Sequence, residues 1–106
     1  MSSPKKPKNS LWYKYQDNDP SRIRIETQLP SLEDEPSVSD IIKEIVKEYT
    51  TLEAGNVTLR VKRPMDVDYE ELNEALFNNC GNNYVTLKDN YGITKDNPIK
   101  IGRAHV

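Results

Sequence analysis

Three kinds of side chain in this sequence could do chemistry: one histidine, one cysteine and a set of carboxylates. His105 is the only candidate base for a Ser-His or Cys-His mechanism, and it lies in the last six residues, IGRAHV. Cys80 lies in NNCGNN, where no neighbouring histidine or lysine favours the thiolate. A lone cysteine also excludes an intrachain disulfide and a cysteine-rich zinc site. The pattern predicts no nucleophilic active site.

The carboxylates gather in two places, Glu33, Asp34 and Glu35 in LEDEP and Asp66 and Asp68 further along. Paired carboxylates can cleave glycosidic bonds, but this chemistry needs a cleft and a raised pKa. A solvated acidic run before a helix is the simpler interpretation of LEDEP. DVDYEE lacks the glycine and the ligand spacing of a calcium loop, and no glycine-rich phosphate loop occurs. The sequence predicts no catalytic residue, cofactor, metal site or small-molecule substrate, and therefore no enzyme.

Charge divides the chain into a basic leader and an acidic body. Residues 1–10, MSSPKKPKNS, are polar and broken by proline, and we expect a disordered leader. PKKPK could be a nuclear-import signal, a weak phosphate-binding tail or a merely solvated segment. Residues 11–100 hold 11 Lys and Arg against 17 Asp and Glu, which argues against nucleic-acid binding by this body. The sequence also shows neither a signal-peptide apolar region nor a membrane-spanning run.

The elements that must position any site begin with two alternating runs, LWYKYQ and RIRIETQL, on either side of the turn DNDPS. This pattern is typical of a β-hairpin. SVSDIIKEIVKEY then repeats apolar residues at helical spacing and predicts one long helix over about 37–50. We expect Ser37 to cap this helix, with Asp40 completing a capping-box-like pair. The apolar stripe could dock a partner, but the neighbouring strands favour its burial in the core.

Further along, VTLRVKR predicts a strand, DYEELNEALF a short helix capped by Asp68, YVTL a short strand, and PIKI the start of a last strand. The order β-β-α-β-(short helix)-β-β predicts an α+β fold with one long helix packed across a mixed sheet. It is similar to the order of the ubiquitin-like β-grasp fold. That likeness implies a last strand in the middle of the sheet, parallel to the first.

The remaining candidate site is a surface. The outward positions of the predicted strands could form a sheet face that binds an acidic or strand-like protein partner, which the sequence does not identify. The alternative is that these are ordinary exposed strand residues. The aromatic side chain among them is either covered by the leader or used in binding. The candidate protein-binding residues are Trp12, Lys14, Arg22, Arg24, Arg60 and Lys62.

The ending IGRAHV has an explanation in the genetic code. The nucleotides ATC GGA AGA GCA CAC GTC encode these six residues and match the start of a common short-read sequencing adapter. The adapter's first two bases, AG, fit the end of a lysine codon, and residue 100 is Lys. We therefore predict that residues 101–106 are an adapter-derived tail, that the last strand is truncated, and that His105 has no function. The alternative is a genuine, exposed chain end.

Residues 11–101 resemble the ubiquitin-like N-terminal domain of Crinkler-type effector proteins. LWYKYQD, RIRIETQLP, SVSDIIKEIVKEY and LKDNYGITKDNPIKI carry the resemblance. It implies a non-catalytic interaction module, with effector activity in a missing C-terminal domain and secretion or delivery into a host cell. Two features depart from the family pattern, since the sequence has neither an LFLAK-like motif nor a visible signal peptide.

The alternative is a free-standing ubiquitin-like or Ras-binding-type adaptor, cytoplasmic or nuclear, that binds by strand pairing or through the sheet face. A conjugated modifier fits less well, because the chain has no Gly-Gly.

Overall fold

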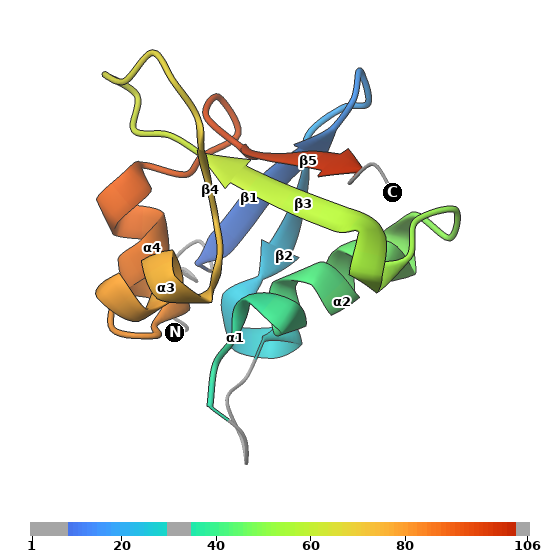
Figure 1. The fold of residues 1–106 in the computed structure, drawn as a ribbon, viewed down its shortest axis with the longest axis horizontal. Helices are drawn as coiled ribbons and strands as arrows, with labels where there is room; N and C mark the ends of the chain where they lie inside the picture. The colour runs from blue at the N-terminus through green and yellow to red at the C-terminus, as the bar shows by residue number, and fades with distance from the viewer. Residues whose placement is uncertain (1–8, 30–34, 104–106) are drawn as a thin grey trace, which may run out of the picture.

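Five strands form a mixed sheet in the order β2-β1-β5-β3-β4 (Figure 1). The computed structural model describes residues 9–29 and 35–103. The strands are β1 (Ser10–Tyr15), β2 (Ser21–Arg24), β3 (Val57–Val61), β4 (Glu70–Glu71) and β5 (Ile99–Arg103). The helices are α1 (Ile25–Gln28), α2 (Val38–Glu48), the 3-10 turn η1 (Ala54–Asn56), α3 (Glu74–Asn79) and α4 (Tyr84–Tyr91).

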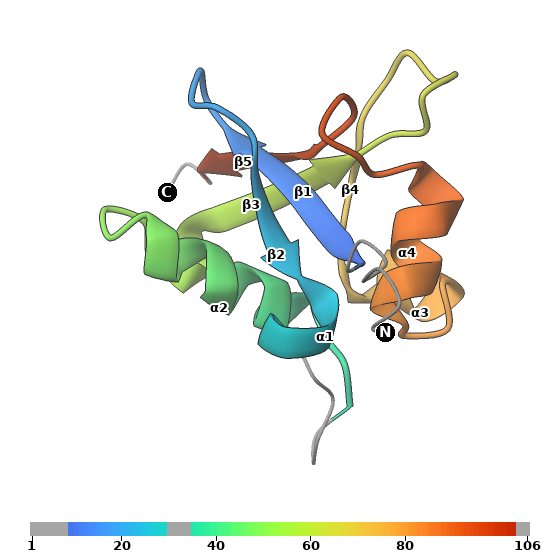
Figure 2. The same ribbon diagram turned by 180° about the vertical axis from the view of Figure 1, so that it is seen from behind.

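The predicted fold class is confirmed: the domain is α+β, with a mixed sheet and few helices, and it is β-grasp-like. β1 pairs antiparallel with β2 and parallel with β5. β5 also pairs antiparallel with β3, so the last strand lies in the middle of the sheet. Figures 1 and 2 show α2 lying across one side of the strands, with α3 and α4 together at one end of the sheet.

Period-two alternation sends one side of each long strand into the core. Leu11 and Tyr13 of β1, Ile23 of β2 and Leu59 of β3 are buried, while the residues between them are half-buried or exposed. α2 supplies its predicted apolar stripe to the same core, through Val38, Ile41 and Ile45.

The capping prediction for α2 is wrong in its detail. Ser37 holds the N-cap position, but its hydroxyl makes no capping hydrogen bond. The carboxylate of Glu74, at the start of α3, instead accepts the Val38 N–H at 3.1 and 3.3 Å. The Tyr84 hydroxyl donates to Asp40 Oδ2 at 2.9 Å and accepts the Ser37 N–H at 3.0 Å. A distant segment therefore satisfies the helix start that we expected a local side chain to satisfy.

Three further element predictions are wrong. The strand expected over RIRIETQL ends at Arg24, and the chain continues as α1. YVTL is the first turn of α4, which Asn83 caps by accepting the Thr86 N–H at 2.9 Å. The helix expected over DYEELNEALF is shorter: Asn73, not Asp68, caps α3. Short apolar runs do not separate strand from helix by periodicity. The asparagine caps mark where α3 and α4 begin, whereas α1 has no side-chain cap.

Some predictions concern residues outside those described. These are the basic leader up to residue 8, Glu33 and Asp34 of LEDEP, and His105. At the domain boundaries, β1 begins at Ser10 and β5 continues through Arg103. The adapter origin of the last six codons stays a prediction.

Buried tyrosines predict alkaline instability. Burial raises the pKa of Tyr13 from 10.0 to about 12, and burial also raises the pKa of Tyr84 and Tyr91. Because the unfolded phenols ionise first, their contribution to stability is complete below about pH 10 and is lost as the pH rises toward 12. We expect the free energy of unfolding, measured by urea titration, to fall between pH 9 and 12, and Tyr13→Phe to reduce that fall by roughly 2 kcal/mol. An equal pH dependence in the variant and the wild type would contradict this assignment.

Candidate protein-binding face

The outward face of the sheet carries a row of cations across three adjacent strands. The register places Lys14 of β1 beside Lys100 of β5, and Lys100 beside Arg60 of β3. Glu71 of β4 stands opposite Arg60 and ends the row. We call Lys14, Lys100 and Arg60 the basic row.

Close placement of like charges has a cost. Directly opposite like charges on neighbouring strands destabilise a sheet by a fraction of a kcal/mol per pair. Within residues 9–29 and 35–103, no member of the basic row takes part in an ion pair that would offset this repulsion. The domain as a whole carries net negative charge, so this positively charged face differs in sign from the rest of the surface.

An indole lies at one end of this face. Trp12 of β1 stands directly opposite Arg22 of β2, and the Arg22 guanidinium carbon lies 5.8 Å from the centroid of the indole ring. Trp12 is half-buried and packs against the core cluster, so one part of the ring is fixed while another part reaches solvent. Arg24 extends the face along β2 beyond the indole.

A phenol lies at the other end of the face. The Tyr69 ring has two ammonium groups within cation–π distance, Lys62 Nζ at 5.7 Å and Lys100 Nζ at 5.4 Å. A shallow hollow of about 490 Å³ adjoins this ring. Gly102 lets the β5 backbone lie close to Thr58, since a Cβ there would be only 2.8 Å from Thr58 Oγ1. The hollow is lined by Thr58, Arg60, Tyr69, Lys100, Ile101, Gly102 and Arg103.

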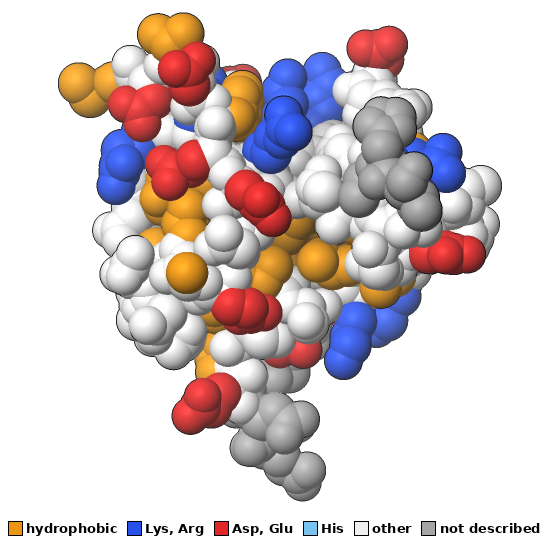
Figure 3. Space-filling view, viewed as in Figure 1, with side chains coloured by type: hydrophobic (Ala, Val, Ile, Leu, Met, Phe, Trp, Pro, Cys, Tyr) orange, Lys and Arg blue, Asp and Glu red, His pale blue; other side chains and the backbone are white. Residues whose placement is uncertain are grey.

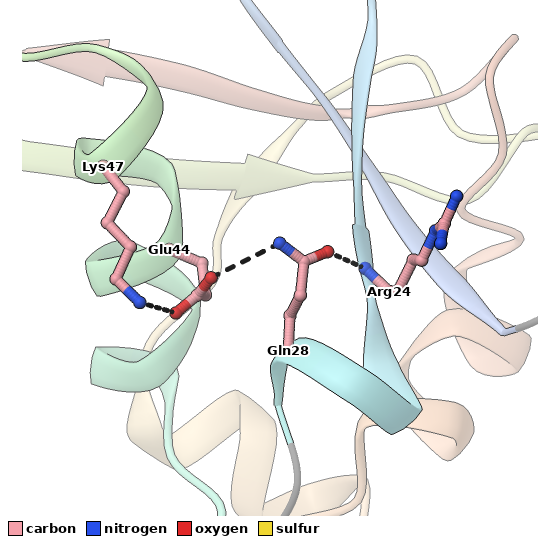
Figure 4. Close-up of polar contacts among 4 residues, drawn as sticks. All are labelled: Arg24, Gln28, Glu44 and Lys47. Atoms are coloured by element: carbon pink, nitrogen blue, oxygen red, sulfur yellow. Dashed lines mark hydrogen bonds and ion pairs between the residues drawn. The ribbon is translucent and has the colours of Figure 1, made fainter.

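The free edge of β2 is partly blocked for pairing with an added strand. The Arg24 N–H points away from β1, and the Gln28 side-chain oxygen accepts it at 2.7 Å (Figure 4). Gln28 is itself held by α2, because its amide donates to Glu44 at 3.5 Å and Glu44 is paired with Lys47. A side chain therefore occupies one of the backbone donors that an added strand would use.

A second hollow, of about 290 Å³, lies between β4, α3 and α4, and Cys80 is buried in its wall. Arg63 covers the ring of Tyr91 there, at 4.7 Å from the centroid. Across the described part of the chain, no three His, Cys, Asp or Glu side chains lie close enough together to hold a metal ion. No helix among the described residues is long and apolar enough to cross a membrane.

The six predicted binding residues all lie on the outward side of the sheet. They form two groups on different strands, and β5 lies between these strands, which the sequence alone does not reveal. Trp12, Lys14, Arg22 and Arg24 come from the β1–β2 hairpin, whereas Arg60 and Lys62 come from β3 and the residue after it. Lys100 was missed in the sequence analysis. Its place between Ile99 and Ile101 in the alternating run PIKI could have indicated that it faces outward. Tyr69, which falls within the helix expected over DYEELNEALF, was also missed.

The comparisons with known proteins give one family. A family model described as "Domain of unknown function (DUF8732)" matches residues 9–104. No curated protein and no solved structure matches the chain. The match covers every described residue, the whole sheet included, and the chain therefore belongs to the DUF8732 family.

Proposed function

We propose that this domain is a non-catalytic interaction module that binds an acidic segment of a protein partner on the outward face of its sheet. The observation that carries the proposal is the basic row, in which Lys14, Lys100 and Arg60 stand side by side and form no ion pair within the described residues, while Glu71 is the carboxylate opposite Arg60 at one end of the row. An arrangement that costs stability in the free domain is explained if a bound anionic group relieves the repulsion.

The chemistry of the face supports a protein partner. Arginine and lysine would attract an acidic segment over a distance and set its orientation. Trp12 and Tyr69 would supply large, rigid contact surfaces at the two ends, and aromatic and arginine side chains are enriched at protein interfaces. The acidic remainder of the domain opposes nucleic acid, whose backbone would meet repulsion beyond this one face.

Two protein contexts fit such a module. As the N-terminal module of a Crinkler-like effector, it would serve a longer protein whose activity lies in another domain, secreted or delivered into a host cell. The sequence resemblance supports this context. As a free-standing adaptor, cytoplasmic or nuclear, it would recruit its partner unaided. The reading frame of the genomic locus after codon 100 distinguishes the two, because only an effector continues into a long second domain.

An acidic peptide tests the proposed function directly. We expect a fluorescein-labelled deca-glutamate peptide to bind at low salt, with an affinity that falls as salt rises, and a deca-glutamine peptide not to bind. Lys100→Glu should weaken deca-glutamate binding about tenfold or more, because it places a carboxylate in the middle of the row. Lys43→Glu, an exposed change of the same charge on α2, is the matched control and should bind nearly as the wild type does.

The same variant separates binding from folding. Lys100→Glu converts the like-charged pairs of residue 100 with Lys14 and with Arg60 into oppositely charged pairs. The free energy of unfolding should therefore stay the same or rise by up to about 1 kcal/mol. Loss of peptide binding in a domain of equal or greater stability would place the interaction on the face. Equal weakening by Lys43→Glu and Lys100→Glu would sink the proposal, as would amide shifts in a titration that avoid β1, β3 and β5.

A further inference from the structure

The loop between β3 and β4 presents apolar side chains to solvent. Met65 is 93% exposed and Val67 is 89% exposed, and they are the exposed large hydrophobic residues of the described chain. They alternate with two carboxylates, Asp66 and Asp68, which are exposed as well. We call residues 65–68 the loop tip.

The base of this loop is held in place. The Asp66 N–H donates to the Arg63 carbonyl at 2.9 Å, which closes a turn. The Asn97 side-chain amide donates to the Lys62 carbonyl at 2.9 Å, and the Pro64 ring packs close to Gly92. The tip therefore projects from a fixed base, and its apolar groups are not buried against the domain's own core.

The loop tip and the outward face are complementary in charge and in chemistry. Figure 3 shows hydrophobic and acidic side chains together over the loop before β4, at the upper left, with Lys and Arg side chains gathered further along the top. Two carboxylates and two apolar groups on the tip correspond to a face of cations with two aromatic rings. The carboxylates of the tip oppose insertion into an anionic membrane.

We propose that the partner of this face is a second copy of the chain, whose loop tip docks on the basic row and on Trp12. The proposal rests on the proposed function and names its partner. Asp66 and Asp68 would pair with Lys14 and Lys100. Met65 and Val67 would lie against the exposed part of the indole, a contact that suits a thioether sulfur.

This contact is heterologous, because the tip and the face are different surfaces. A copy that docks its tip on a neighbour still has a free face, which can bind the tip of another copy. Unless the contacts close into a ring, they therefore build an open chain of copies. A four-residue tip buries less area than a standard stable interface, and the affinity is therefore weak. We expect assembly that grows with protein concentration and declines with salt.

Two variants that each lose one surface give the test. The tip variant carries Met65→Ser, Asp66→Asn, Val67→Ser and Asp68→Asn. The face variant carries Lys14→Gln and Lys100→Gln, and its matched control carries Lys43→Gln and Lys95→Gln at exposed positions outside the strands. Sedimentation equilibrium from 10 μM to 1 mM measures the mass of each protein and of mixtures, and circular dichroism checks that each is folded.

We expect the wild type and the control to increase in mass with concentration, and each variant alone to stay monomeric. An equimolar mixture of the two variants should form a dimer and stop there, because only one intact tip and one intact face remain. A wild type that stays monomeric at 1 mM would overturn self-association, and so would a tip variant that assembles like the wild type. Deca-glutamate binding by the tip variant is an independent readout: its loss, in a folded protein, would overturn the proposed function instead.

Discussion

Phe77→Ala should lower the free energy of unfolding by about 3–5 kcal/mol. Phe77 is 0% exposed, and it is larger than any other side chain that is as completely buried. Its ring stacks on Tyr84, with centroids 5.2 Å apart, and the Tyr84 hydroxyl binds Asp40 and the Ser37 backbone at the start of α2. The substitution would leave a cavity and loosen the side chain that ties α4 to α2.

Urea unfolding followed by circular dichroism measures this loss, and amide hydrogen exchange locates it. Exchange should accelerate at the start of α2 as well as in α3, because Tyr84 connects the two. Asn79→Ala, an exposed change on the same helix, should alter stability by no more than about 0.5 kcal/mol. A Phe77→Ala protein within about 1 kcal/mol of the wild type would mean that the α3–α4 end collapses onto the cavity without cost.

Ending the chain after Lys100 should abolish cooperative folding, or lower stability by more than about 3 kcal/mol. β5 pairs with strands on both sides, and Ile101 is its buried residue beyond that point, next to Tyr15 and Leu59. The shortened chain would lose this burial together with the pairing of Thr58 to Gly102. Central strands are costly to interrupt, because both neighbours lose hydrogen bonds and side-chain contacts at once.

The shortened protein and a control that ends after Arg103 should be compared by thermal unfolding and by amide dispersion in an NMR spectrum. The control keeps all of β5 and should unfold cooperatively. If the protein ending at Lys100 unfolds with the same midpoint as the control, the central position of β5 carries little of the stability. The difference between the two proteins measures what residues 101–103 contribute to the fold.

Patterns of burial could be predicted from the sequence because they are local. Alternation in LWYKYQ and VTLRV determined which side chains of β1 and β3 face the core, and helical spacing determined the buried side of α2. The outward position of the predicted binding residues follows from the same period. Where a run was short, as in YVTL, the periodicity was ambiguous, and capping by Asn83 made it the start of a helix.

The sequence by itself thus determined the α+β class, the long helix and the residue types available at the surface. Only the tertiary structure decided which of these residues stand together. Insertion of β5 between β1 and β3 brings Lys14, Lys100 and Arg60, which are far apart in the sequence, into one row. Likewise, Glu74 reaches the start of α2 only after α3 packs beside it. Strand order and contacts between helices depend on packing across the whole chain, which no local window of sequence contains.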